Sequence, residues 1–295
     1  MQRTRFGLVG TGYWAREVHA VGLAGHPDVE LVGVWGRDQS KATDVAARHG
    51  TTAYADVDAL FEAVDAVAFA VPPTVQAELA LRAAVAGKHL LLEKPVATDL
   101  AAADRLLAAV EEAGVSTVVF FTDRFVPERE AWLQERLRGG ALGARAEWLA
   151  SLRTPDTPYA TSIWRQQEGA LWDVGPHALS ALLPALGPVA EVGGARGFDD
   201  LVSIVLTHEG GATSTVQLSL TMPPEAVRFN LEFYDDQGWH ARPNAPVDVV
   251  EAQQRAVTEL LGQCRAARTD HRCSVRFGRD VVDLLHRIDL ALGPR

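Results

Sequence analysis

The chain has 295 residues, of which 47% are hydrophobic and 22% are charged, and its formal net charge is −10. This length is enough for two domains with their own cores, and the negative charge disfavours nucleic acid or an anionic membrane as the main partner. No stretch resembles a transmembrane helix or a signal peptide. Cys264 and Cys273 lack metal-ligand spacing. We therefore expect a cytoplasmic protein without a metal site or a disulfide framework.

The first predicted strand, residues 6–9, runs into a G-x-G-x-x-A turn that opens a helix predicted over residues 13–23. Gly10 permits the tight turn, Gly12 lets the backbone approach a pyrophosphate, and Ala15 allows close helix packing. The free N–H groups at the helix N-terminus would face the phosphates. A small-residue turn without a ligand is the alternative. The predicted cofactor contacts in this turn are Gly10, Thr11, Gly12, Tyr13 and Trp14.

The second predicted strand, residues 30–35, is followed by Gly36, Arg37 and Asp38. An acidic residue at this strand end would bind the ribose 2′-hydroxyl of NAD. A small residue followed by arginine instead leaves room for a 2′-phosphate and can neutralise it. We therefore interpret Arg37 as a cofactor contact that favours NADP over NAD. If the turn is shifted, Asp38 is the alternative ribose ligand, and Arg37 would then be a solvated loop residue.

Strands and helices continue to alternate through residue 122. Further strands are predicted over residues 51–54, 65–71, 90–92 and 115–121, and helices over 40–49, 56–62, 74–86 and 99–113. Gln39 or Ser40 is the expected cap of the first of these helices, and Thr74 that of the third. Six strands alternating with helices predict an α/β domain with a doubly wound parallel sheet over residues 1–122.

The fifth predicted strand ends in Glu93-Lys94-Pro95, at the sheet edge where ligands of open α/β sheets bind. The chain contains only three lysines, at positions 41, 88 and 94. Unlike arginine, a lysine amine can be adjusted by burial to give and take a proton. Lys94 is therefore a candidate for proton transfer, and a surface Glu-Lys pair before a turn is the alternative. The Lys94–Pro95 bond is a candidate cis peptide.

The pattern changes in residues 123–295, which we predict to form a second, α+β domain. Helices are predicted over residues 125–139, 249–267 and 279–292, and strands over 144–152, 201–207, 212–221 and 228–234. Val216, Leu218 and Leu220 share one strand face, which is expected to pack on a helix. The opposite face is polar and is expected to meet solvent or a partner subunit.

The apolar segment from residue 171 to 186 carries Asp173 and His177, which are four residues apart and would share one face of a helix. An acid and an imidazole placed together can hold a substrate hydroxyl and move a proton. Taken alone, the pair fits better with a helix-cap aspartate and a buried histidine. The rest of the chain is needed to decide between these readings.

Four segments together resemble the glucose–fructose oxidoreductase / inositol dehydrogenase family, often called Gfo/Idh/MocA. They are G-L-V-G-T-G-Y-W-A at residues 7–15, E-K-P at 93–95, R-F-V-P at 124–127, and W-R at 164–165 with E-G-A-L-W-D-V-G-P-H at 168–177. The resemblance implies a Rossmann domain followed by a domain with an open, mostly antiparallel sheet that is often used for oligomerisation. It also implies an NAD(P)-dependent oxidoreductase acting on a CH–OH group of a sugar, a cyclitol or a related alcohol or carbonyl compound.

The resemblance further implies roles for individual residues. Lys94 would be the catalytic lysine, with Asp173 and His177 as its partners on the substrate side. Glu93 would lie near the nicotinamide ribose and Pro72 would line the nicotinamide site. The implied cofactor contacts outside the glycine turn are Pro72, Glu93, Lys94, Trp164 and Arg165. The expected partners are a sugar-like small molecule and further copies of the chain, bound through the C-terminal sheet.

The chain departs from the family pattern near the expected substrate site. Gln76 stands where the family often has histidine, Thr122-Asp123 replaces an Asn-aromatic pair, and Ser180 replaces an aspartate. The substrate therefore stays open. Other functions compatible with the sequence are a non-catalytic NADP-binding sensor or scaffold, and an epimerase or hydrolase that keeps its cofactor bound. A methyltransferase would leave the Glu93-Lys94-Pro95 segment unexplained.

Overall fold

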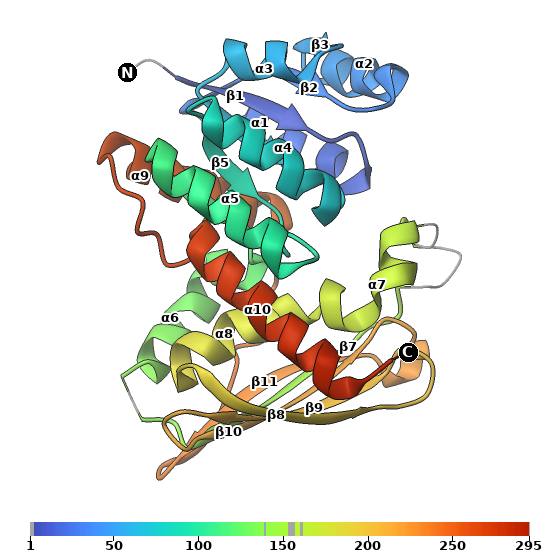
Figure 1. Ribbon diagram of the computed structural model, residues 1–295, viewed down its shortest axis with the longest axis vertical. Helices are drawn as coiled ribbons and strands as arrows, with labels where there is room; N and C mark the ends of the chain where they lie inside the picture. The colour runs from blue at the N-terminus through green and yellow to red at the C-terminus, as the bar shows by residue number, and fades with distance from the viewer. Residues whose placement is uncertain (1–2, 139, 153–156, 160–161, 295) are drawn as a thin grey trace. The chain divides into compact units, whose positions relative to one another are not determined.

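The computed structural model describes residues 3–138, 140–152, 157–159 and 162–294. The chain forms two compact units, each of which is built from two stretches of sequence (Figure 1). The first unit contains the chain up to Phe125 and the later stretch Val247–Val282. The second contains Val126–Pro246 and the residues from Asp283 onwards. Helix α10 (Val275–Leu292) therefore contributes residues to both units.

The first unit holds a six-stranded parallel sheet whose strand order is β3-β2-β1-β4-β5-β6. This is the doubly wound order of dinucleotide-binding domains, and it confirms the predicted parallel sheet. The switch point of this sheet, where the order of successive strands changes direction, lies between β1 and β4, which are hydrogen-bonded neighbours. The strands are β1 (Thr4–Val9), β2 (Val29–Trp35), β3 (Thr52–Tyr54), β4 (Ala66–Phe69), β5 (His89–Leu92) and β6 (Thr117–Val119).

The helices between these strands follow the predicted alternation. They are η1 (Ala15–His19, a π-helical turn), α1 (Ala20–Gly25), α2 (Gln39–Arg48), α3 (Val57–Ala63), α4 (Pro73–Val85) and α5 (Leu100–Ala113). Of these, α2, α3 and α5 begin at aspartate caps. Asp99 caps α5 by accepting from the backbone N–H of Ala102 at 2.8 Å, and Gly114 ends that helix with φ +63°.

Two of the predicted caps are wrong. Helix α2 is capped by Asp38, rather than by Gln39 or Ser40, because the Asp38 carboxylate reaches the backbone N–H of Lys41. Helix α4 begins at Pro73, with Pro72 at the cap position and without a side-chain cap from Thr74. Proline suits the first position of a helix because its missing N–H would have no partner there in any case.

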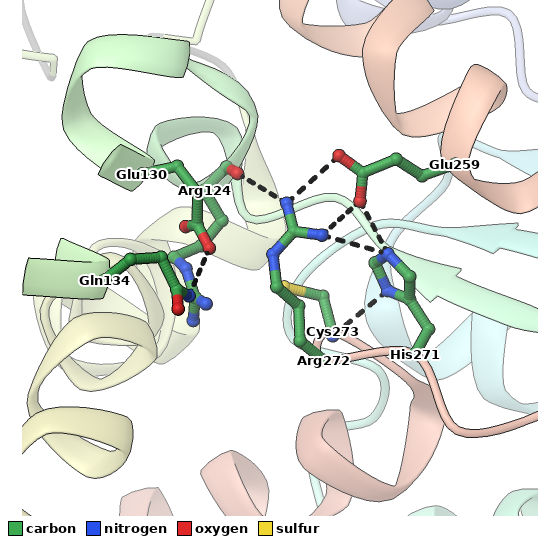
Figure 2. Close-up of polar contacts among 7 residues, drawn as sticks. All are labelled: Arg124, Glu130, Gln134, Glu259, His271, Arg272 and Cys273. Carbon is green, nitrogen blue, oxygen red and sulfur yellow. Dashed lines mark hydrogen bonds and ion pairs between the residues drawn. The ribbon is translucent and has the colours of Figure 1, made fainter. Parts of the chain in front are cut away.

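The C-terminal stretch of the first unit, Val247–Val282, packs against the N-terminal part of that unit and is hydrogen-bonded to it. Helix α9 (Val249–Arg265) lies against α1, where Gln254 donates to the carbonyl of Gly22 at 3.2 Å. Figure 2 shows Glu259 of α9 facing His271 and Arg272, which follow that helix in the chain. The His271 Nε2 lies 2.7 Å from the Glu259 carboxylate, and Arg272 also donates to the carbonyl of Arg124 at 2.9 Å. Arg124 belongs to the short 3-10 helix η2 (Thr122–Phe125).

The second unit is built on a mixed sheet with the order β12-β11-β7-β10-β9-β8. Only the β7–β10 pair is parallel among the described strand pairs, so the predicted, mostly antiparallel sheet is confirmed. The sequence pattern did not reveal β8 and β12. The strands are β7 (Gly143–Leu149), β8 (Val189–Arg196), β9 (Val202–His208), β10 (Thr213–Ser219), β11 (Arg228–Asp235) and β12 (Gly238–Ala241).

One face of this second sheet is covered by helix α8 (Gly175–Leu186), which packs on β7 and β10. Val216, Leu218 and Leu220 are buried, as predicted from their alternation. The remaining helices of this unit are α6 (Pro127–Arg136) and α7 (Ile163–Asp173), and a short 3-10 turn, η3, spans Pro224–Ala226. Within the described residues, no helix has the length and apolarity that a membrane span needs.

Candidate functional site

The glycine turn follows β1, as its sequence predicted, and it therefore lies at the switch point of the parallel sheet. Gly10 follows β1 with φ +141°, and a Cβ placed on it would lie 2.4 Å from the carbonyl oxygen of Ala70, just beyond β4. A Cβ on Gly12 would instead meet nothing within 4 Å. Gly10 therefore packs the turn against β4, whereas the open space at Gly12 fits the close approach of a phosphate group. Ala15 is fully buried behind the turn.

The two candidate ribose contacts, Arg37 and Asp38, both follow the end of β2. Asp38 accepts from the backbone N–H of Lys41 at 3.2 Å, and this hydrogen bond lowers the pKa of the Asp38 carboxyl from its ordinary value. The ammonium group of Lys41 also lies 3.5 Å from Asp38. Asp38 is therefore engaged as a helix cap, and both Arg37 and Asp38 are exposed.

The third part of this edge is the end of β5, where Glu93 and Lys94 are both half-buried. The Lys94–Pro95 bond is cis, as predicted. The Glu93 Oε1 atom accepts from the indole N–H of Trp14 at 2.7 Å and lies 2.8 Å from the Nε2 of His19. Two side chains that the sequence assigned separately to the cofactor, Trp14 and Glu93, are therefore bonded to each other.

Pro72 also lies at this edge of the sheet, where it is exposed between β4 and α4. The glycine turn, Pro72 and Lys94 thus follow the carboxyl ends of β1, β4 and β5, which are adjacent strands of one sheet. His19 is the residue of this region that sequence reasoning missed. It is fully buried on the helical segment after the glycine turn, and no spacing signal distinguishes it from an ordinary core histidine.

Gln76, whose place in the sequence led us to expect it near the substrate site, lies inside the first unit. Its side chain is fully buried, and both of its amide atoms bond to the backbone of Glu93. Ser180 is likewise buried, and its hydroxyl donates to the carbonyl of His177 at 2.8 Å. At both of these positions, the side chain is therefore buried and hydrogen-bonded to the backbone of its own unit.

In the second unit, Asp173 is paired with Arg165. The Nε of Arg165 donates to the Oδ2 of Asp173 at 2.7 Å, and only 3% of Asp173 is exposed. The Arg165 guanidinium also lies over the rings of Tyr159 and Trp164, at 4.4 Å and 5.4 Å from the ring centroids. These contacts fix the direction in which the Asp173 carboxylate is presented.

Asp173 and His177 do not lie on one continuous helix, so that part of the prediction is wrong. Helix α7 ends at Asp173, Val174 has φ −106° and ψ −17°, and α8 begins at Gly175. Pro176 contributes to this break, because it has no backbone N–H to donate to the preceding turn, as a continuous helix would require. His177 is half-buried in the first turn of α8.

The predicted site residues therefore fall into two groups, one in each unit. The first unit carries the glycine turn, Arg37, Pro72, Glu93 and Lys94, and the second carries Trp164, Arg165, Asp173 and His177. Among the described residues, no group of three or more histidine, cysteine, aspartate or glutamate side chains is arranged to hold a metal ion.

Comparison with known proteins decides the family. Residues 4–121 match the oxidoreductase family with an NAD-binding Rossmann fold, and residues 131–240 match the GFO/IDH/MocA C-terminal domain. The chain is 30% identical over 276 residues to D-xylose 1-dehydrogenase (NADP(+)) 2 of Haloferax volcanii, a match that covers 87% of this chain and 83% of that protein. The chain belongs to the Gfo/Idh/MocA family of oxidoreductases.

The names of other similar proteins refer to nucleotide-linked sugars. The dTDP-3,4-didehydro-2,6-dideoxy-alpha-D-glucose 3-reductase of Streptomyces antibioticus is 30% identical over 197 residues, which are 65% of this chain and 60% of that protein. Among solved structures, UDP-N-acetylglucosamine 3-dehydrogenase GnnA from Acidithiobacillus ferrooxidans shares the fold with a TM-score of 0.84 at 22% identity, over 99% of this chain and 98% of that chain.

Proposed function

We propose that the protein is an NAD(P)-dependent dehydrogenase or reductase that acts on a hydroxyl or carbonyl carbon of a sugar or nucleotide-linked sugar. The observation that carries this proposal is the shared edge of the first sheet, where the Gly10 turn after β1 and Lys94 after β5 flank the end of β4. A dinucleotide site and a proton-transferring amine at one sheet edge are the two parts that such a reaction needs.

The residues at this edge fit a dinucleotide. The backbone of Gly10, Thr11, Gly12, Tyr13 and Trp14 would hold the pyrophosphate, and the open space at Gly12 supports this assignment. Arg37 would meet a 2′-phosphate, which favours NADP over NAD because Asp38 is engaged as a cap. The remaining proposed cofactor contacts are Pro72, Glu93, Lys94, Trp164 and Arg165. When bound, the dinucleotide supplies the redox step by exchanging a hydride with the substrate carbon.

The acid–base work is assigned to Lys94, Asp173 and His177. In the reducing direction, Lys94 or His177 gives a proton to the substrate oxygen as negative charge develops on it, and in the oxidising direction the same group takes the proton back. Asp173 orients the substrate and its proton donor. Its pairing with Arg165 supports this role, because a carboxylate that is held in one direction loses little entropy when the substrate binds.

We also propose that the protein is a cytoplasmic homo-oligomer that assembles through the outer face of the second sheet. Helix α8 covers the opposite face, and the outer face carries a hollow lined by Arg145, Glu147, Ser203, Thr215 and Gln217. Glu147 is 3% exposed and pairs with Arg145 and Arg228, each at 2.8 Å. The exposed Val205 lies beside these charges and offers apolar area for a partner subunit.

The test is a screen of aldoses, inositols and nucleotide-linked sugars with NADP⁺, in which the formation of reduced nicotinamide is measured. For any substrate found, Lys94→Met should lower kcat by about 10² or more and change the dinucleotide affinity by a much smaller factor, so that binding is retained. Lys88→Met is the matched control, because Lys88 bonds to the carbonyl of Val64 and is not among the proposed site residues. Turnover retained by Lys94→Met would remove the catalytic assignment.

A preparation that shows no net redox change needs one further measurement. Denaturation should then be followed by analysis of the released nucleotide. Tightly held dinucleotide together with substrate conversion would favour the epimerase or hydrolase alternative, whereas dinucleotide binding without conversion of any substrate would favour a sensor or scaffold.

A further inference from the structure

The side-chain amide of Gln76 is hydrogen-bonded to the backbone on both sides of Lys94. The Oε1 of Gln76 accepts from the backbone N–H of Glu93 at 2.8 Å, and its Nε2 donates to the carbonyl of Glu93 at 2.7 Å. The same Nε2 lies 3.2 Å from the carbonyl of Pro95. Gln76 therefore bonds to the main chain on both sides of Lys94.

These bonds begin where the strand pairing stops. Strand β5 pairs with β4 as far as Leu91 and with β6 as far as Leu92. By binding both the N–H and the carbonyl of Glu93, the Gln76 amide takes the place that a neighbouring strand would occupy one residue further on. Gln76 is fully buried on α4, so water does not compete for these bonds.

The Glu93 side chain supplies a second attachment. Its Oε1 atom accepts from Trp14 and faces His19, and its Oε2 atom accepts from the backbone N–H of Lys94 at 3.3 Å. The Nδ1 atom of His19 is buried and has no hydrogen-bond partner in the part of the chain that the structure describes. Since an unpartnered N–H would be costly there, we assign the proton to Nε2, which then donates to Glu93.

We propose that Gln76 is the positioning residue for Lys94, and that the Glu93 carboxylate, held by Trp14 and His19, is the second anchor of the same segment. This inference rests on the proposed role of Lys94. Neither Gln76 nor His19 needs to touch substrate. The two anchors fix the main chain that carries the amine, and they attach it to α4 and to the helical segment after the glycine turn.

The experiment measures the reactivity of Lys94 in the unliganded protein. Trace acetic anhydride labels free amines, and peptide mass spectrometry can then report each of the three lysines separately. Lys41 is an exposed reference, and Lys88, three residues beyond the end of α4, reports any displacement of that helix. Gln76→Met removes the amide and approximately keeps the side-chain volume.

In Gln76→Met we expect the labelling rate of Lys94, relative to Lys41, to change by about threefold or more, whereas that of Lys88 stays within experimental error. For a substrate found in the screen, kcat should fall by about tenfold or more with a smaller change in the KM for dinucleotide. Unchanged Lys94 labelling and kcat would overturn the proposal, even if the variant were less stable.

Two further variants keep the test decisive. Should Gln76→Met fail to fold, Gln76→Glu keeps the acceptor for the Glu93 N–H and loses the donor, and His19→Leu removes the donor toward Glu93. Altered Lys94 labelling in either variant supports the proposal, and unchanged labelling in both overturns it. Failure of the proposed function is seen separately, as a wild-type protein that binds no dinucleotide. Dinucleotide binding and turnover together with unchanged Lys94 labelling would overturn only the positioning role.

Discussion

The Nε of Arg165 lies 2.7 Å from the Oδ2 of Asp173, and this ion pair joins a residue that the sequence assigned to the cofactor with one that it assigned to catalysis. The Asp173 side chain is almost completely buried, whereas that of Arg165 is 27% exposed. Removal of the arginine would leave a carboxylate in the interior of the second unit without this partner, which costs more than the pair itself contributes.

Arg165→Met should therefore destabilise the second unit by about 2 kcal/mol, below the range for fully buried pairs because Arg165 is partly exposed. Asp173→Asn should relieve much of that cost when it is combined with Arg165→Met, since no buried charge is then left behind. Urea unfolding of the two single variants and the double variant measures this coupling. Strictly additive costs would show that the two residues do not depend on each other.

Gly10 and Gly12 should respond differently to alanine. Gly10→Ala places a Cβ 2.4 Å from the Ala70 carbonyl at a positive φ, so a loss of stability of about 2 kcal/mol or more is expected. Gly12→Ala meets no neighbour within 4 Å, so it should fold normally and instead bind dinucleotide more weakly, because the methyl group occupies the space proposed for phosphate. Thermal unfolding and dinucleotide titration separate the two effects. Normal dinucleotide binding by Gly12→Ala would contradict the phosphate site.

Glu259 should make the first unit sensitive to acid. Burial alone would raise the pKa of this carboxyl, but hydrogen bonds from His271 and Arg272 and the charge of Arg272 lower it from 4.5 to about 2. A carboxyl with a lowered folded pKa contributes stability that is fully present above its unfolded pKa and is lost as the pH falls from 4.5 toward 2.

The difference in unfolding free energy between wild type and Glu259→Gln should therefore be largest above pH 4.5 and should shrink below it. About 1–2 kcal/mol is expected at neutral pH, after allowance for the partial exposure of the side chain. Denaturant unfolding at a series of pH values measures it. A difference that does not vary with pH would contradict the lowered pKa.

Local sequence signals predicted most of the first unit. The alternation of apolar strands with helices predicted the parallel sheet, and the glycine turn after β1 follows from short-range backbone chemistry. The break between Asp173 and His177 was also readable in principle, because Gly175 and Pro176 interrupt a helix. The four-residue spacing of Asp173 and His177 alone does not reveal this interruption.

Tertiary contacts account for what the sequence could not predict. Gln76 reads as an ordinary polar residue of an amphipathic helix, and its bonds to the backbone of Glu93 depend on how α4 lies beside β5. The same holds for His19. The apolar pattern of α9 predicts a helix with one buried face, but it does not say that this face packs in the first unit, on α1.

The most direct test of the central claim is a titration of the purified protein with NADP⁺ and with NAD⁺, in which binding is monitored by tryptophan fluorescence. The same titrations are made with the variants Arg37→Ala and Arg48→Ala. We predict that NADP⁺ binds about tenfold more tightly, a difference of about 1.4 kcal/mol. Arg37→Ala should abolish this preference, whereas Arg48→Ala, at the far end of α2, should keep it. Tighter NAD⁺ binding would transfer the ribose contact to Asp38. A protein that binds neither dinucleotide and releases none on denaturation would contradict the proposed function.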